Sequence, residues 1–274
     1  MIAFAQRSQH DELAASFVAQ SRRSDTSPTG PEDISSVESP RSPSLGRLLR
    51  TNLGILAMVH LPFADRVEAG RLLAIELSSP EIAETQSAAA VVLALTRGGV
   101  PVGFTVADRL RIPLEIIVVR KLGVPWQPEL AMGAVAGGTR ILDDQMIRQL
   151  EISDQDIENI IAREQAEMRR REDLHRAGRP ALDLNGKSVI IVDDGLATGS
   201  TMVAAVRHVR GLKPARVIIG VPVGSRQACN RLRPEVDGLV CLATPEAFFA
   251  VADWYRNFGQ VSDAEVQTLL AESH

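Results

Sequence analysis

The chain has 274 residues, of which 45% are hydrophobic and 23% charged, and its net charge is −4. This size allows one large α/β domain with an extension, and the charge excludes a general attraction to nucleic acid or to an anionic membrane. No run of 18 apolar residues and no basic-then-apolar N-terminus is present, so we expect neither a membrane span nor a secretory signal. The two cysteines, Cys229 and Cys241, are too few for a disulfide framework, which fits a cytoplasmic protein.

The first 60 residues differ in composition from the rest of the chain. Residues 21–46 are rich in Ser and Pro and contain few large apolar side chains. Such a segment cannot bury enough surface to offset its ordering entropy, so we predict a disordered extension over residues 1–60. The apolar patch LGILAMVHL at 53–61 is the exception, and we interpret it as a segment that docks on the main domain, residues 61–274.

From Phe63 onward the pattern becomes regular. Apolar residues at helical spacing predict helices over 63–77, 99–110, 153–176, 199–211 and 224–233. Continuous apolar runs predict strands at 90–95, 114–120, 188–194, 215–223 and 239–243, with a hairpin over 132–144. Strands of this kind, separated by helices, are typical of a parallel sheet covered on both faces. The predicted fold class is therefore α/β, a Rossmann-like doubly wound parallel sheet.

The long helix at 153–176 is rich in arginine, which raises the alternative of a nucleic-acid contact. Its basic residues are interleaved with acids, and one apolar stripe repeats at helical spacing. We therefore interpret the charges as a solvated face and expect no nucleic-acid partner.

The segment VIIVDDGLATGSTM, residues 189–202, carries the clearest chemistry. Asp193 and Asp194 follow a buried strand at its carboxyl end, where parallel sheets bind ligands. Residues 195–201 then turn into a helix, whose free N–H groups and dipole favour a phosphate. Carboxylates accept hydrogen bonds from sugar hydroxyls and attract Mg²⁺. A phosphorylated ribose fits both halves of this segment.

The same segment resembles the phosphoribosyl-diphosphate-binding signature of the type I phosphoribosyltransferases. The similarity extends over about 63–270 and includes LALTRGGVPVG, VVRKLGVPWQPELAMGAV and CLATPEAFFAVADWY. The combination resembles a bacterial subgroup whose acceptor is poorly defined. It implies that family's doubly wound sheet, with a small hood and a flexible active-site loop.

The resemblance implies roles for the loop after the strand. Asp193 and Asp194 would hold the ribose 2- and 3-hydroxyls, and Mg²⁺ would be linked to them indirectly, through the same hydroxyls or water. The residues that would bind the 5-phosphate are Ala197, Thr198, Gly199, Ser200 and Thr201.

The turn after the first core strand resembles the family's diphosphate loop. It consists of Thr96, Arg97, Gly98 and Gly99. Adjacent glycines let backbone amides face an anion, and Arg97 supplies charge with paired donors. Taken alone, this sequence is also compatible with an ordinary strand-to-helix turn.

Lys121 resembles the family residue that reaches the diphosphate from the next strand end, although a salt bridge with local acids is an alternative. Residues 122–138 resemble the mobile loop that closes over the site and excludes water. Glu129 is the only carboxylate in that loop and could assist proton transfer, or it could simply be solvated. We thus expect Arg97, Lys121 and Glu129 to be the catalytic side chains.

The implied reaction replaces the diphosphate at ribose C1 with a small nitrogenous acceptor. Ala197 departs from the hypoxanthine-guanine type, which has an acidic residue there, and is closer to the adenine type. Two segments are candidates for the hood that selects the acceptor, 143–185 and 244–271. The second is rich in aromatic residues, which either stack on a base or belong to the core.

Two other functions remain open at this stage. One is a non-catalytic regulator that binds phosphoribosyl diphosphate or a nucleotide; retention of Arg97, both glycines and Lys121 favours an enzyme over it. The other is a hydrolase or phosphorylase that uses the same phosphate cradle. A homodimer is common among relatives of the family and is a further expectation.

Overall fold

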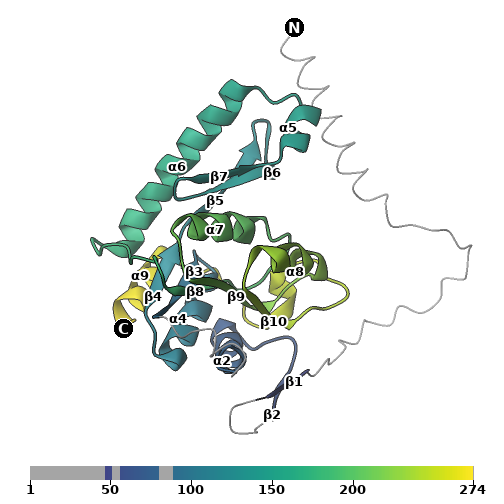
Figure 1. Ribbon diagram of the computed structural model, residues 1–274. Coiled ribbons are helices and arrows are strands. Elements are labelled where there is room, and N and C mark those ends of the chain that lie inside the picture. The colour runs from purple at the N-terminus through teal and green to yellow at the C-terminus, as the bar shows by residue number, and fades with distance from the viewer. Residues whose placement is uncertain (1–46, 51–55, 80–88, 274) are drawn as a thin grey trace, which may run out of the picture.

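The computed structural model describes residues 47–50, 56–79 and 89–273. Its centre is a five-stranded sheet in which every neighbouring pair is parallel (Figure 1). In spatial order the strands are β10 (Gly238–Ala243), β9 (Arg216–Val223), β8 (Ser188–Val192), β3 (Ala90–Leu95) and β4 (Leu114–Ile117). The predicted doubly wound α/β sheet is confirmed.

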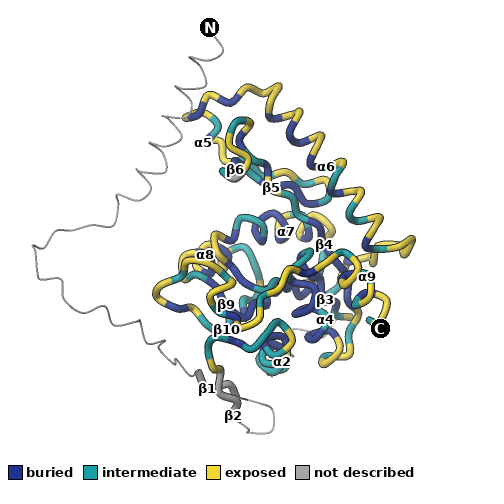
Figure 2. Tube along the Cα trace, turned by 180° about the vertical axis from the view of Figure 1, so that it is seen from behind, coloured by how far each residue is buried: buried dark blue, intermediate teal, exposed yellow. Residues whose placement is uncertain are grey.

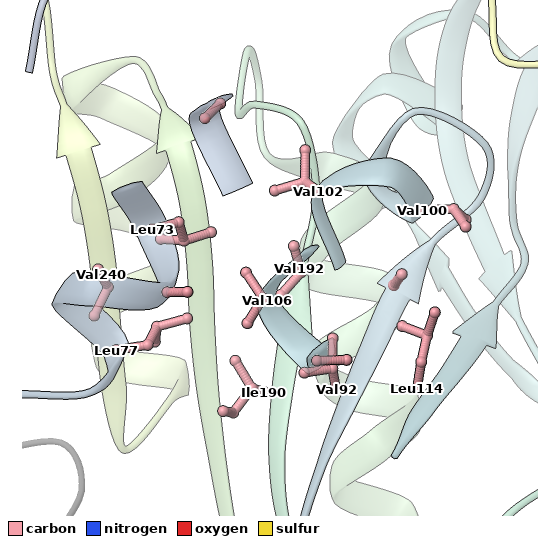
Figure 3. Close-up of a cluster of buried hydrophobic side chains, with 14 of the residues drawn as sticks. Leu73, Leu77, Val92, Val100, Val102, Val106, Leu114, Ile190, Val192 and Val240 are labelled. Atoms are coloured by element: carbon pink, nitrogen blue, oxygen red, sulfur yellow. The ribbon is translucent and has the colours of Figure 1, made fainter. Parts of the chain in front are cut away.

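Helices cover both faces of this sheet because successive strand residues point to opposite sides. The helices α2 (Arg66–Leu77) and α4 (Gly99–Leu110) cover one face, where Val106 lies beside Val92 and Ile190 and Leu73 belongs to the same apolar cluster (Figure 3). The opposite face is covered by α7 (Ser200–Gly211) and α8 (Arg226–Leu232). Two apolar clusters, one on each face, thus hold the sheet in place.

A second, smaller sheet stands beside the first. It is antiparallel and consists of β5 (Val119–Val124), β6 (Gln127–Ala136) and β7 (Thr139–Leu142). The helices α5 (Asp144–Gln149) and α6 (Asp154–Arg176) pack on it around an apolar cluster of their own. Along α6, buried and exposed residues alternate in bands, as the predicted apolar stripe requires (Figure 2).

The structure adds three details to the sequence-based prediction. The strand expected over 114–120 changes sheet at Val118, because β4 pairs with β3 whereas β5 pairs with β6. Most of the segment expected to be a mobile loop, 122–138, lies in the β5–β6 hairpin. Helix α5 was not predicted; the side chain of Asp143 caps it by accepting a hydrogen bond from Met146 N.

The first and last described segments contribute several short elements. Within the extension for which disorder was expected, β1 (Arg47–Arg50) and β2 (Leu56–Val59) form an antiparallel pair, and residues 1–46 and 51–55 lie outside the described residues. The C-terminal part contains the short helices η2 (Arg233–Glu235) and η3 (Val251–Trp254), and then α9 (Asp263–Glu272). None of the helices that the structure describes combines the length and the apolar character needed to cross a lipid bilayer.

Candidate functional site

The strand order reverses between β3 and β8, and this is where an α/β sheet opens a crevice for a ligand. The turn Thr96–Gly99 follows β3, and the acidic pair Asp193 and Asp194 follows β8. The two meet closely. A Cβ atom on Gly98 would lie 2.1 Å from Asp194 Oδ2, and one on Gly99 would lie 2.7 Å from Val192 O. A side chain at either position would therefore force the neighbouring segment to move.

Backbone contacts hold the turn itself. Thr96 N donates to Ile117 O at 3.1 Å, which ties the turn to the end of β4. The Thr96–Arg97 peptide bond is cis. Arg97 then points its guanidinium toward α9, with Nη1 3.7 Å from Asp263 Oδ1.

The two aspartates are crowded and poorly hydrated. Asp194 N donates to Asp193 Oδ1 at 2.9 Å. Burial, followed by the charge of Asp194, raises the pKa of Asp193 well above its ordinary value. Burial also raises the pKa of Asp194, although the Arg66 guanidinium opposes that shift. The pair is therefore costly to keep ionised, and a bound cation or a hydrogen-bonding ligand would relieve that cost.

Sequence reasoning did not find Arg66, the cation that holds Asp194. Its Nε and Nη2 each lie 2.9 Å from Asp194 Oδ2, and its Nη1 donates to Gly259 O at 2.8 Å. The guanidinium also stacks 3.8 Å above the Phe258 ring. A separation of 128 residues along the chain hides this pairing from any local motif.

Two of the C-terminal aromatics complete the support of the acidic pair. Tyr255 Oη donates to Asp194 O at 2.6 Å, and its ring packs on Phe63 and Phe258. Burial raises the pKa of this phenol, so Tyr255 remains a neutral donor. Phe249, in contrast, is 89% exposed, so the aromatic segment is only in part core.

The loop after the aspartates, residues 197–201, is more open. Gly199 has φ of +75°, which suits glycine, and it caps α7, which begins at Ser200. Ala197 and Thr198 are exposed. Ser225 Oγ donates to Ala197 O at 2.6 Å and so holds the loop from the α8 side. The loop thus presents the free N–H groups of a helix start toward solvent.

A cleft of about 620 Å³ opens between the two sheets. Thr96, Asp193 and Thr201 line it from the core, Lys121 lines it from β5, and α6 closes the far side. Within the described ranges no ion pair joins Lys121 to an acid, whereas its neighbour Arg120 binds Glu164 at 2.7 Å. Glu129 belongs to β6, but its side chain lies outside the described residues.

Similarity to known proteins identifies the family of the chain. A family model described as "Phosphoribosyl transferase domain" matches residues 67–257. The chain belongs to the phosphoribosyl transferase domain family. The match includes the turn, the acidic pair and the loop that follows it, and it ends before α9.

Relatives of this phosphoribosyl transferase domain are found in two strains of Mycobacterium tuberculosis, CDC 1551 and H37Rv. Both are named "putative phosphoribosyl transferase" and are 44% identical over 213 residues, 77% of this chain. The chain spans about half of their length, 47%. The crystal structure of TT1426 from Thermus thermophilus is 40% identical, with a TM-score of 0.65, and the match covers 78% of this chain and 99% of that one.

Proposed function

We propose that the protein is an Mg²⁺-dependent phosphoribosyltransferase, which moves the 5-phosphoribosyl group from phosphoribosyl diphosphate to a nitrogen acceptor and releases diphosphate. One observation carries this proposal: Gly98 packs directly against Asp194. The diphosphate turn and the ribose-phosphate loop are therefore adjacent at one switch point and can hold two ends of a single ligand.

The donor would lie along the edge formed by the ends of β3 and β8. We assign the 5-phosphate to the start of α7, where backbone N–H groups and the helix dipole favour an anion. The ribose hydroxyls are assigned to Asp193 and Asp194, and the diphosphate to the turn at Thr96–Gly99 with Lys121. Of these residues, Thr96, Lys121, Asp193 and Thr201 line the same cleft.

The acidic pair fits a magnesium ion that is held mainly by the substrate. The part of the chain that the structure describes has no group of three His, Cys, Asp or Glu side chains suited to a metal. Mg²⁺ commonly binds through one or two carboxylates together with water and substrate phosphates. Bound in this way, Mg²⁺ would neutralise charge that develops on the departing diphosphate.

The protein's own contribution would be positioning and electrostatics. Arg97 and Lys121 would stabilise the leaving diphosphate, while Asp193 and Asp194 fix the ribose as positive charge develops at C1. This route needs no covalent nucleophile. We assign acceptor selection to the two hood candidates, 143–185 and 244–271, within a single domain that spans 61–274.

The test combines calorimetry with diphosphate release. The wild-type protein with Mg²⁺ should bind phosphoribosyl diphosphate and release diphosphate with at least one compound from a panel of nucleobases and amines. Tight binding without turnover across a broad panel would instead favour a non-catalytic regulator. Asp194→Asn should weaken ribose-phosphate binding while the fold stays intact; unchanged binding would refute the site assignment.

A second pair of variants isolates the diphosphate turn. Arg97→Ala should weaken binding of phosphoribosyl diphosphate more than binding of a nucleoside monophosphate, because only the former carries a diphosphate. Arg109→Ala, on the helix that follows the turn but exposed, is the matched control and should change neither affinity. Equal losses for both ligands with Arg97→Ala would contradict the assigned role.

A further inference from the structure

Arg97 is held by an acidic residue that lies outside the family match. Asp263 Oδ1 is 3.7 Å from Arg97 Nη1, and it is the one acidic partner of Arg97 among the described residues. Both side chains are partly exposed, 30% for Arg97 and 39% for Asp263. The contact connects the diphosphate turn with the start of α9.

Asp263 is itself fixed from the opposite side. His175, at the end of α6, is fully buried and donates from Nε2 to Asp263 Oδ1 at 2.9 Å. No group in the described part of the chain pairs with its Nδ1. The hydrogen bond from His175, followed by the charges of His175, Arg97 and Arg171, lowers the pKa of Asp263. Asp263 is therefore a carboxylate with a fixed orientation.

The frame around this carboxylate is rigid. Ser262 caps α9 by accepting a hydrogen bond from Glu265 N, and Val266 and Leu270 anchor the helix in the core. Gln267 Nε2 donates to Leu174 O at 2.6 Å, which fastens α9 to the end of α6. Asp263 thus has a defined position relative to the core sheet, and so does the arginine that faces it.

A partly exposed ion pair at this distance contributes little to the free energy of folding. Its main effect is to restrict where the Arg97 guanidinium lies. We propose that Asp263 is a positioning residue, which restricts the Arg97 guanidinium to one place beside the turn assigned to diphosphate and is itself held by His175. This inference rests on the proposed function, because it requires the turn at Thr96–Gly99 to bind diphosphate.

A simpler role for Asp263 is that of an acid in the first turn of a helix, where it interacts favourably with the dipole. Glu265 shares that role from the same turn, and it is exposed. Glu265→Gln therefore removes a comparable charge without touching Arg97, and it is the matched control for a substitution at Asp263.

The decisive substitution is Asp263→Asn, which keeps an oxygen for His175 and removes the charge that faces Arg97. In calorimetry with Mg²⁺, we expect this variant to bind phosphoribosyl diphosphate and inorganic diphosphate about three- to fivefold more weakly, equivalent to roughly 0.6–1 kcal/mol, the upper range for a partly exposed ion pair. Its affinity for ribose 5-phosphate should stay within about twofold of wild type. Asp263→Glu should recover part of the loss, and Glu265→Gln should bind all three ligands like wild type.

Three outcomes would overturn the proposal. Asp263→Asn would bind diphosphate with wild-type affinity, or it would lose the same affinity for all three ligands, or Glu265→Gln would weaken binding as much as Asp263→Asn does.

Failure of the proposed function would give a different pattern of results. If the wild type binds phosphoribosyl diphosphate without turnover, the transferase proposal is wrong but the positioning role is still supported by the binding data. If the wild type does not bind it, both proposals are wrong.

Discussion

The two segments that we propose bind anions lie at one edge of the sheet and are built in opposite ways. The turn after β3 is enclosed: Gly98 and Gly99 pack on Asp194 and on the end of β8. The loop after β8 is open, with Thr198 exposed and a helix start facing solvent. An enclosed turn depends on the absence of side-chain atoms, whereas an open loop depends on backbone donors that most substitutions leave in place.

The enclosed turn should be the more sensitive of the two, and Gly98→Ala is the strongest way to break it. The added methyl would lie 2.1 Å from Asp194 Oδ2, so the turn or the acidic pair must move. A displacement of about 1 Å at a reacting centre costs on the order of a hundredfold in rate. We expect kcat/KM for phosphoribosyl diphosphate to fall by about that factor.

Gly211→Ala provides the control for this substitution. Gly211 ends α7, and a Cβ atom there would meet nothing within 4 Å. Alanine in a helix is favoured over glycine by roughly 0.5–1 kcal/mol, so activity should be kept and thermal stability should be equal or slightly higher. Full activity in Gly98→Ala would show that the turn can move away from Asp194 without loss of function, and that close packing at Gly98 is not required.

A smaller effect is expected where the two segments meet, at Asp193. The pKa of Asp193 in the folded protein is raised above its ordinary value of 3.8. The stability that this group contributes is therefore fully present below about pH 3.8 and is lost as the pH rises through the pKa of the folded state. Asp193→Asn keeps the oxygen that accepts from Asp194 N but carries no buried charge. The ligand-free variant should therefore gain free energy of unfolding over wild type, and this gain should grow as pH rises above about 4.

Urea unfolding at several pH values measures this difference. Asp183→Asn removes an exposed carboxylate and controls for the loss of one charge. A stability gain in Asp193→Asn that does not depend on pH would show that the desolvated charge is not its cause. In either case the variant should bind the ribose-phosphate ligand more weakly, since it has one carboxylate fewer.

The smallest effect is expected in the open loop. Thr198→Ala removes one exposed hydroxyl, whose net contribution to binding is about 0.5–1.5 kcal/mol, so ribose 5-phosphate affinity should fall roughly two- to tenfold. Calorimetry of the variant against wild type is sufficient to see this. A loss as large as that of Gly98→Ala would remove the contrast between the two segments.

The local parts of the site could be predicted from the sequence. A strand followed by two aspartates and a T-G-S-T turn is written in contiguous residues, and β8 and α7 lie within about two residues of their predicted bounds. The cap of α6 at Ser153 is likewise local, since its side chain accepts from Asp156 N. Hydrophobic periodicity and capping act over a few residues, which is why such elements can be read directly.

The parts that could not be predicted depend on contacts between distant segments. Arg66 precedes the acidic pair by more than a hundred residues, and the sequence around it contains no motif that marks it as a site residue. Asp263 stands in an ordinary helix start, so only the folded arrangement brings it to Arg97. The change of sheet at Val118 was hidden for another reason: the apolar run IIVV, residues 116–119, continues unbroken across it.

The hydrogen bond that Tyr255 donates to Asp194 O has a consequence for synthesis of the chain. The aspartates leave the ribosome before Tyr255 and Asp263, since translation runs from the N-terminus. A nascent chain that already carries the complete acidic motif still lacks the hydroxyl that holds Asp194 O and the carboxylate that faces Arg97. The site is therefore completed late, after α9 has emerged, although its most recognisable residues are made much earlier.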